Sequence, residues 1–268
     1  MAADLDSQPL LEARAISKRF GGVRALEGVS AFFHAGEIVA VMGENGAGKS
    51  TLMKCLAGVH QPNEGEVAVD GEVIQIPDVR AAENLGIAFI HQELNLAENL
   101  NIGANVYLGR EPRILGPFFN QREIRVRTRK LLGDLELEID PDTPVRDLSI
   151  GHRQMVEIAK ALSQKARILI MDEPTSSLSL HETRVLFRLV KKLRDEGMCI
   201  VFISHRMAEV EEIADRVIVL RDGRNSGELG REEIGRDRIV SLMVGRKLVV
   251  HQKASGKTGE VLLEVCDL

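Results

Sequence analysis

Short apolar runs alternate with helical patterns along much of the chain. The runs lie at Glu37–Met42, Arg167–Met171, Cys199–Ile203 and Asp215–Leu220, and they are rich in Val and Ile. Runs of this length and composition are typical of strands buried on both faces of a parallel sheet. After Leu180, apolar residues recur at spacings of three and four, which predicts an amphipathic helix. Strand, helix and strand in repetition predict an α/β fold with right-handed crossovers.

Two regions depart from this alternation. Near the start, Leu10–Phe20 and Arg24–His34 have the pattern of two strands around a Gly-Gly turn, and Glu66–Val69 has that of a third. They predict a small antiparallel sheet beside the parallel one. Residues 97–164 contain few strand-like runs, and we predict a helical subdomain inserted in the α/β core. Its helical patterns lie at Asn99–Leu108, Asn120–Leu135 and His152–Ser163.

Length, charge and cysteine content limit the number of domains, the kinds of partner and the compartment that this chain can have. With 268 residues, the chain can form one large domain or two small ones. Its net charge of −5 argues against a nucleic-acid partner, which usually meets a basic face. No apolar run approaches the roughly 18 residues that span a bilayer. The three widely spaced cysteines, Cys55, Cys199 and Cys266, are most simply reduced thiols of a cytoplasmic protein.

The tail contains a partial repeat of the start. Residues 251–259 are polar with two glycines, which predicts a linker. The last residues, 260–268, include Leu262–Glu264, which repeats the Leu-Leu-Glu of Leu10–Glu12. A match this short can arise by chance. The more specific interpretation is a first domain over 1–250 and then the first strand of a second copy.

A phosphate-binding loop is the strongest chemical signal. Residues 43–51 read GENGAGKST, the GxxxxGK[ST] pattern, between a predicted strand and a helix that starts near Lys49. Its glycines allow positive φ, so that successive N–H groups point into one concavity at a helix N-terminus. Lys49 is expected to reach the β- and γ-phosphates, and the Ser50 hydroxyl to bind Mg²⁺. The predicted nucleotide-binding residues of the loop are Gly43, Glu44, Asn45, Gly46, Ala47, Gly48, Lys49, Ser50 and Thr51.

Two carboxylates follow another predicted strand. Asp172 and Glu173 come directly after an apolar run and precede Pro174, which favours an extended residue before it and ends the strand. Asp172 occupies the position at which a carboxylate is expected in a phosphate-loop ATPase, where it would hold Mg²⁺ through water. Glu173 is the candidate that orients and activates the attacking water. The alternative for Glu173 is a surface carboxylate at a strand exit.

Together these residues resemble the ATP-binding-cassette (ABC) family, from about residue 10 to residue 247. The resemblance implies a P-loop NTPase core and three further site residues. His205, in FISHR, would contact the γ-phosphate and act with Lys49 and Glu173. Gln92, in AFIHQEL, would reach Mg²⁺ together with Ser50 and Asp172, and would sense a membrane partner. Phe20 would stack on adenine. Taken alone, a histidine such as His205 is more often structural; the alternative for Phe20 is a residue of the core.

The family's LSGGQ signature is altered here. Leu148–His152 reads LSIGH, and Ser179 replaces the usual Asp in the loop after Pro174. Ser149 and Gly151 open a helix N-terminus, which suits an anion. In the family, this segment binds the γ-phosphate that is held by the opposite domain of a head-to-tail dimer. The departures predict that this segment completes a partner's site poorly, whereas the chain's own phosphate loop is intact.

Longer stretches resemble one subfamily. LSIG…QMVEIAKAL, HQELNL, SHRMAEVEEIADRVIVLRDG and LMVGRKL are similar to tandem ATPases of bacterial monosaccharide importers of the ribose, galactose, arabinose and xylose type. The resemblance implies ATP and Mg²⁺ as cofactors, and one competent site shared with a second cassette of the same chain. It also implies transmembrane permease subunits, indirectly a periplasmic sugar-binding protein, and a peripheral location on the cytoplasmic face of the inner membrane.

Two other functional classes stay open at this point. A non-transport cassette ATPase acting on ribosomes, DNA or chromosomes usually carries coiled-coil insertions, zinc cysteines or basic linkers, and the sequence shows none of them. A nucleotide-binding fragment with little turnover is the third hypothesis, because the signature is altered. The first hypothesis is an import ATPase, with in-line attack of water on the γ-phosphate.

Overall fold

A six-stranded sheet forms the centre of the fold in a computed structural model that describes residues 8–115, 118–164 and 166–245. Its order is β12-β11-β3-β10-β9-β6, with β12 antiparallel at one edge and the other strands parallel. The strands are β3 (Ile38–Met42), β6 (Ile87–Ile90), β9 (Ile168–Asp172), β10 (Cys199–Ile203), β11 (Arg216–Arg221) and β12 (Arg224–Gly230). The predicted α/β core is confirmed, and strand bounds differ from the expected ones by one or two residues.

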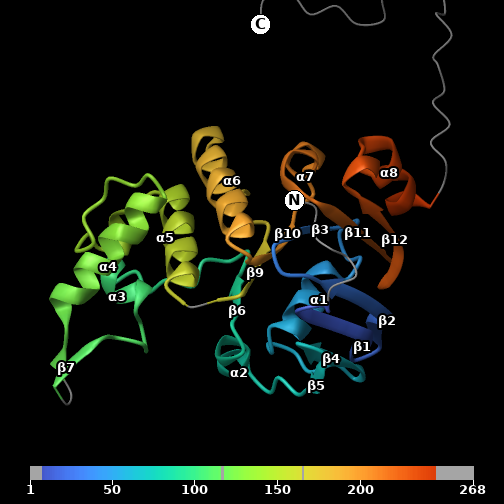
Figure 1. Cartoon of the computed structure of the whole chain (residues 1–268), viewed down its shortest axis with the longest axis horizontal. Coiled ribbons are helices and arrows are strands. Elements are labelled where there is room, and N and C mark those ends of the chain that lie inside the picture. The colour runs from blue at the N-terminus through green and yellow to red at the C-terminus, as the bar shows by residue number, and fades with distance from the viewer. Residues whose placement is uncertain (1–7, 116–117, 165, 246–268) are drawn as a thin grey trace, which may run out of the picture.

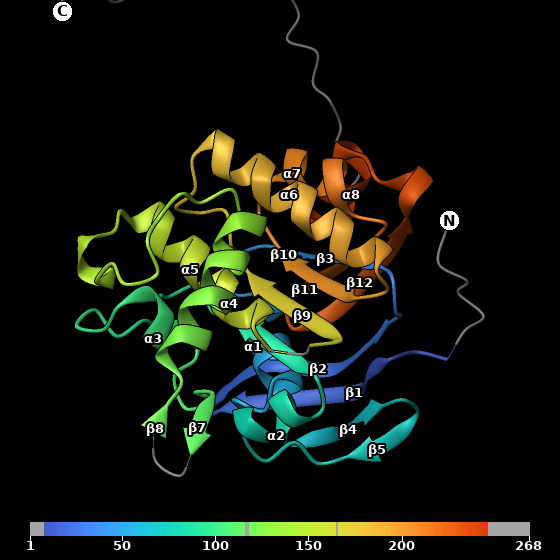
Figure 2. The ribbon, with the colours of Figure 1, turned by 60° about the vertical axis from the view of Figure 1, so that its left-hand side comes forward.

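A second, antiparallel sheet lies beside the first (Figures 1 and 2). Its order is β2-β1-β4-β5, and its strands are β1 (Leu11–Phe20), β2 (Val23–Phe33), β4 (Glu64–Val69) and β5 (Glu72–Ile74). Helix α1 (Lys49–Leu56) shares one hydrophobic core with both sheets, through Leu52, Met53 and Leu56. This core also includes Val39 and Val41 of β3. The predicted antiparallel sheet is confirmed, and it gains β5; the short helix α2 (Val79–Asn84) follows it.

Helices that follow β9, β10 and β12 in the chain cover much of the other face of the central sheet, and α5 (Ile150–Leu162) of the helical subdomain packs there as well. The helices after these strands are α6 (Leu180–Asp195), α7 (Met207–Ile213) and α8 (Arg236–Val244), which gather on one side of the molecule (Figure 1). Alternate residues of β3 meet them, because successive side chains of a strand point to opposite faces. Ile38 packs in the cluster that holds α6, and Ala40 and Met42 pack in the cluster that holds α7 and α8.

A helical subdomain projects from the core between β6 and β9, as predicted (Figure 1). It contains α3 (Ile102–Val106), α4 (Gln121–Asp134), a 3₁₀ turn (Val145–Asp147) and α5 (Ile150–Leu162). Helix α3 is shorter than expected because Asn101 caps it, accepting a hydrogen bond from the Ala104 N–H. The sequence did not predict the small hairpin of β7 (Arg113–Leu115) and β8 (Phe118–Phe119) in this region.

Some expectations cannot be compared with this fold. The predicted linker over 251–259 and the predicted strand over 260–268 lie outside the described residues. Within the described ranges, no helix has both the length and the apolar character needed to cross a bilayer.

Candidate active site

The predicted phosphate loop joins β3 to α1, and its backbone conformation requires glycine. Gly43, Gly46 and Gly48 all have positive φ, at 154°, 83° and 99°, as expected from the sequence. A Cβ atom on Gly43 would lie 2.3 Å from the Leu220 carbonyl oxygen. One on Gly48 would lie 2.6 Å from the Ala25 carbonyl oxygen. The loop is therefore held against the backbones of β11 and β2 at separations that exclude a side chain.

Two alanine substitutions in this loop should differ in effect. Gly46→Ala meets no atom within 4 Å, so it carries only the strain of positive φ, about 1–2 kcal/mol. Gly48→Ala adds a clash with the backbone and should therefore lower both the melting temperature and nucleotide affinity further. Thermal unfolding and nucleotide titration of the two variants measure this difference. Equal losses would show that the close approach to Ala25 does not matter.

Lys49 and Asp172 form the buried, charged floor of the site. Lys49 is 7% exposed, and its Nζ donates to the Gly43 and Glu44 carbonyl oxygens at 2.9 Å each. Burial lowers the pKa of Lys49, although Glu173 and Asp172 act in the opposite direction. Asp172, at the end of β9, is 3% exposed, and burial raises its pKa. A hydrogen bond with the Ser50 side chain opposes that rise.

Three side chains meet at the carboxyl ends of neighbouring strands. Glu173 Oε2 accepts a hydrogen bond from Gln92 Nε2 at 3.3 Å, and its Oε1 lies 3.2 Å from His205 Nδ1. These residues follow β9, β6 and β10, which are adjacent in the sheet. Glu173 itself has φ of 49°, and its N–H donates to the Ile203 carbonyl oxygen at 3.0 Å. A non-glycine residue with this φ is uncommon and is held there by its surroundings.

A cleft of about 690 Å³ unites these groups. This volume suits a nucleotide-sized ligand. Its lining residues are Phe20, Val23, Arg24, Ala25, Asn45, Gly46, Gly48, Lys49, Ser50, Thr51, Gln92, Glu173 and His205. Asp172 is the buried partner of Ser50 behind this lining, and Gly43, Glu44 and Ala47 complete the loop. The sequence-predicted set therefore converges on one place, apart from the signature-like segment.

The antiparallel sheet supplies one wall of the cleft. Phe20 is 43% exposed, so it is not a core residue; its ring meets that of His60 edge-on, with centroids 5.1 Å apart. Sequence reasoning missed Val23, Arg24 and Ala25. The β1–β2 hairpin brings them in, because Phe20 pairs directly with Val23. The signal was the Gly-Gly turn, which places the next strand opposite Phe20.

The signature-like segment lies outside the cleft, at the start of α5. Ser149 caps the helix and accepts a hydrogen bond from the His152 N–H at 3.2 Å. A Cβ atom on Gly151 would lie 2.8 Å from an oxygen of Glu182. That carboxylate belongs to the capping box that Ser179 forms at the start of α6. Sequence reasoning did not predict this carboxylate beside Gly151.

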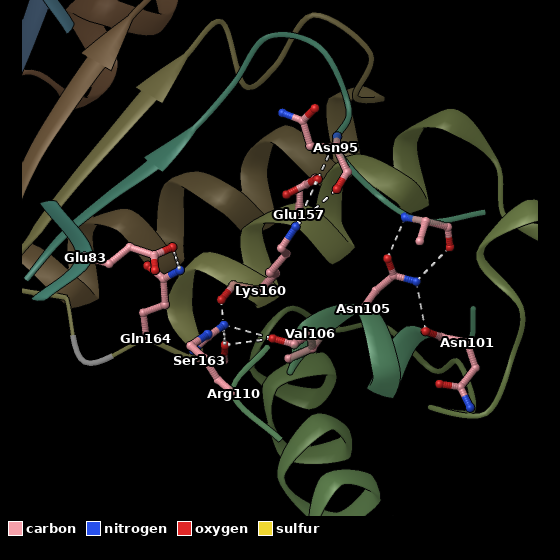
Figure 3. A network of polar contacts seen from close by, with 11 residues as sticks. Glu83, Asn95, Asn101, Asn105, Val106, Arg110, Glu157, Lys160, Ser163 and Gln164 are labelled. Carbon is pink, nitrogen blue, oxygen red and sulfur yellow. Dashed lines mark hydrogen bonds and ion pairs between the residues drawn. The ribbon is translucent and has the colours of Figure 1, made fainter. Parts of the chain in front are cut away.

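The segment that follows Gln92 is tied to the helical subdomain (Figure 3). The Asn95 N–H donates to Glu157 Oε1 at 2.8 Å, and Lys160 Nζ donates to the Asn95 carbonyl oxygen at 3.1 Å. Asn105 of α3 bonds both the N–H and the carbonyl oxygen of Ala97. Gln92 is thus bonded to Glu173 in the cleft, and the segment after it is bonded to α3 and α5.

A phosphate loop, a strand-end Asp-Glu pair and an inserted helical subdomain define an α/β nucleotide-binding domain of the cassette type. The profile of the ABC transporter family matches residues 26–176, more than half of the chain. The chain belongs to the ABC transporter family, and its cleft is that of an ATP-binding cassette.

Relatives and solved structures agree with this assignment. A ribose import ATP-binding protein of Rubrobacter xylanophilus is 48% identical over 259 residues, which are 96% of this chain and 52% of that protein. A putative ribose/galactose/methyl galactoside import ATP-binding protein of Burkholderia lata is 46% identical over 260 residues, which are 96% of this chain and 51% of that protein. The chain therefore spans about half the length of the curated relatives it matches.

Two cassette structures show the same fold. A nucleotide-free ATP-binding cassette from an ABC transporter superposes with a TM-score of 0.77 and 26% identity, over 87% of this chain and 98% of that one. A dimeric cassette in a post-hydrolysis state, bound to ADP and Pi, superposes with a TM-score of 0.73 and 28% identity, over 82% of this chain and 98% of that one.

Proposed function

We propose that the chain is the first cassette of an ATPase that powers monosaccharide import. It would bind ATP with Mg²⁺ in the cleft, and it would hydrolyse the nucleotide when paired with a second cassette. The carrying observation is that Glu173 contacts both Gln92 and His205 beside the phosphate loop. Similarity to ribose and galactose import ATP-binding proteins supports the sugar class. In this proposal residues 1–250 form the cassette, with residues 97–164 as its helical subdomain.

The cleft offers complementary places for the parts of ATP. The exposed ring of Phe20 suits the adenine, since aromatic faces stack on bases. The phosphates would lie on the N–H groups of residues 43–51, at the N-terminus of α1, where the helix dipole favours negative charge. Lys49, which now bonds two loop carbonyl oxygens, would turn to the β- and γ-phosphates.

The residues beside the loop fit a magnesium ion. The Ser50 hydroxyl, the Asp172 carboxylate and the Gln92 amide all supply oxygen, which is the ligand type that Mg²⁺ requires. The Ser50 side chain lowers the pKa of Asp172 through a hydrogen bond, which supports a role for Asp172 beside that hydroxyl. Asp172 would then hold Mg²⁺ through water. When bound, Mg²⁺ would neutralise charge that develops on the phosphates.

In this proposal Glu173 would act on the attacking water, and Gln92 and His205 would orient the Glu173 carboxylate. Glu173 is the group that would accept a hydrogen bond from that water and orient it toward the γ-phosphate. Gln92 and His205 contact its two oxygens, so the carboxylate is held in one orientation. His205, which lines the cleft, would also contact the γ-phosphate. Catalysis would then rest on positioning and electrostatics.

A second cassette completes the proposed site. Ser149 and Gly151 lie outside this chain's own cleft, so they would serve the opposite cassette, and that cassette's signature would face Lys49. The other proposed partners are permease subunits and, indirectly, a periplasmic sugar-binding protein, with no nucleic acid. Residues 83–108 around Gln92 would meet the permease at the cytoplasmic face of the inner membrane.

The test is Mg-ATP hydrolysis by the chain alone and by the chain joined after Leu268 to the second half of the ribose import relative. We expect the joined protein to be at least about tenfold faster, because in this proposal the second half supplies an unaltered signature to the site at Lys49. Equal turnover by the chain alone would show that LSIGH completes a site in a homodimer. No turnover in either form would leave a nucleotide-binding module.

A further inference from the structure

A buried carboxylate lies next to the cleft but does not line it. Glu209, on α7, is 8% exposed. Its Oε2 accepts hydrogen bonds from Thr175 Oγ1 at 2.9 Å and from Ser204 Oγ at 2.8 Å. Its Oε1 accepts one from Arg206 Nη1 at 3.1 Å. A buried carboxylate is costly unless it is paired and hydrogen-bonded, and here both oxygens are used.

The partners of Glu209 flank two candidate catalytic residues. Thr175 lies two positions after Glu173, and Ser204 and Arg206 lie on either side of His205. One carboxylate therefore joins the segment that leaves β9 to the segment that leaves β10. Thr175 and Ser204 are each 2% exposed, so these bonds are shielded from water.

The hydroxyl of Ser204, the residue before His205, has a defined hydrogen-bond direction because it contacts Glu209. Ser204 Oγ accepts the Arg206 N–H at 3.0 Å, so its hydroxyl proton is available to Glu209. Both hydroxyls, of Thr175 and Ser204, donate to Glu209 Oε2. The turn from Ser204 to Arg206 is closed around His205 by these bonds. His205, with its side chain 56% exposed, has only Glu173 as an ion-pair partner among the described residues.

We propose that Glu209 is a positioning residue, which holds His205 and Glu173 at their mutual distance through Ser204 and Thr175. Its effect on hydrolysis rests on the proposed function, whereas its effect on the place of His205 does not. A displacement of about 1 Å in such a constellation is enough to cost around 100-fold in rate. Glu209 would thus set catalysis without touching the nucleotide.

Histidine resonances give a test that needs no turnover. In the chain labelled with ¹³C at histidine Cε1, the His205 signal is assigned with His205→Asn. We expect Glu209→Ala to shift this signal, while the His60 and His34 signals stay in place and far-UV circular dichroism is unchanged. Glu211→Ala is the matched control, because Glu211 is an exposed glutamate on the same helix. An unmoved His205 signal in folded Glu209→Ala overturns the proposal.

Two milder variants decide the case if Glu209→Ala does not fold. Thr175→Val is nearly isosteric and removes one donor, and Ser204→Ala removes the other. Each should shift the His205 signal in the same direction as Glu209→Ala does. Glu209→Gln keeps an oxygen that can accept from the hydroxyls, so its His205 signal should lie close to that of the unmutated chain. Absence of any shift in both hydroxyl variants would overturn the proposal equally.

Measurements of kcat and KM for ATP distinguish a positioning role of Glu209 from a general loss of stability. The two-cassette protein is this chain joined after Leu268 to the second half of the ribose import relative. In it, Glu209→Ala should lower kcat at least about tenfold, with KM for ATP changed by less than about twofold. A rise in KM with unchanged kcat would contradict the proposal, because the nucleotide-binding loop would then be the part affected. If the unmutated protein does not hydrolyse ATP, the proposed function fails, and the His205 signal still decides the role of Glu209.

Discussion

Glu173→Gln should reduce ATP hydrolysis by about 10²–10⁴-fold while nucleotide binding is retained, the range that a positioned general base contributes. The amide keeps the size of the side chain, but it is far less able to accept a proton from water. The phosphate loop is unchanged, so nucleotide should bind with similar affinity. Steady-state hydrolysis in the two-cassette protein and nucleotide titration of the chain measure the two quantities.

The control for this prediction is a charge change nearby. Glu93→Gln removes a carboxylate one position from Gln92, on an exposed residue that does not line the cleft. It should leave turnover within about twofold of the unmutated value, because Glu93 does not line the cleft and a surface substitution of this kind usually changes the free energy of unfolding by only about 0.5 kcal/mol. Unchanged turnover in Glu173→Gln would mean that Glu173 is a surface carboxylate at a strand exit.

Lys49→Met should weaken ATP affinity by roughly 10- to 150-fold, which corresponds to the 1.5–3 kcal/mol of a hydrogen bond to a charged group. Methionine fills a similar volume but offers no donor. The substitution also leaves the Gly43 and Glu44 carbonyl oxygens without the amine that now bonds them. The loop should therefore be less ordered in the free protein. Calorimetric titration with Mg-ATP measures the affinity.

Lys54→Met provides the matched comparison for that experiment. Lys54 lies on the same helix, α1, at its last turn, and does not line the cleft. Its loss should change affinity by a small factor only. Equal weakening in both variants would indicate a long-range charge effect in place of a direct contact between Lys49 and phosphate.

The electrostatics of the cleft follow from burial of opposite charges side by side. Burial lowers the pKa of Lys49 and raises that of Asp172, because desolvation disfavours each charged form. The two groups offset part of this cost for one another, as does the Ser50 bond to Asp172. Polyphosphate would offer Lys49, and Mg²⁺ would offer Asp172, a further partner of opposite charge, which is a physical reason for nucleotide binding at this place.

Several residues of the candidate site were predictable because their signals are local. The loop at 43–51 combines glycines, a lysine and a hydroxyl with an apolar strand before it and a helix after it, and the structure has that order. Asp172 and Glu173 were found at the end of an apolar run, and His205 after another. Strand ends in a parallel sheet carry functional groups, so each motif pointed to the same edge.

Other features depend on contacts between distant segments and carried no local signal. The β7–β8 hairpin was missed because each of its strands has only two or three residues. Glu182 was not connected with Gly151, since 31 positions separate them in the sequence and only helix packing brings them together. Glu209 resembled an ordinary acidic residue of a surface helix until its bonds to Thr175 and Ser204 were visible.

The sequence by itself determined the class of fold, the phosphate loop and the identity of the strand-end carboxylates, because hydrophobic period and glycine placement act over a few residues. Only the tertiary structure decided that β6, β9 and β10 are neighbours, so that Gln92 and His205 meet Glu173. Strand order is chosen by burial and backbone pairing between segments far apart in the chain. No local pattern encodes that choice, and the geometry of the site depends on it.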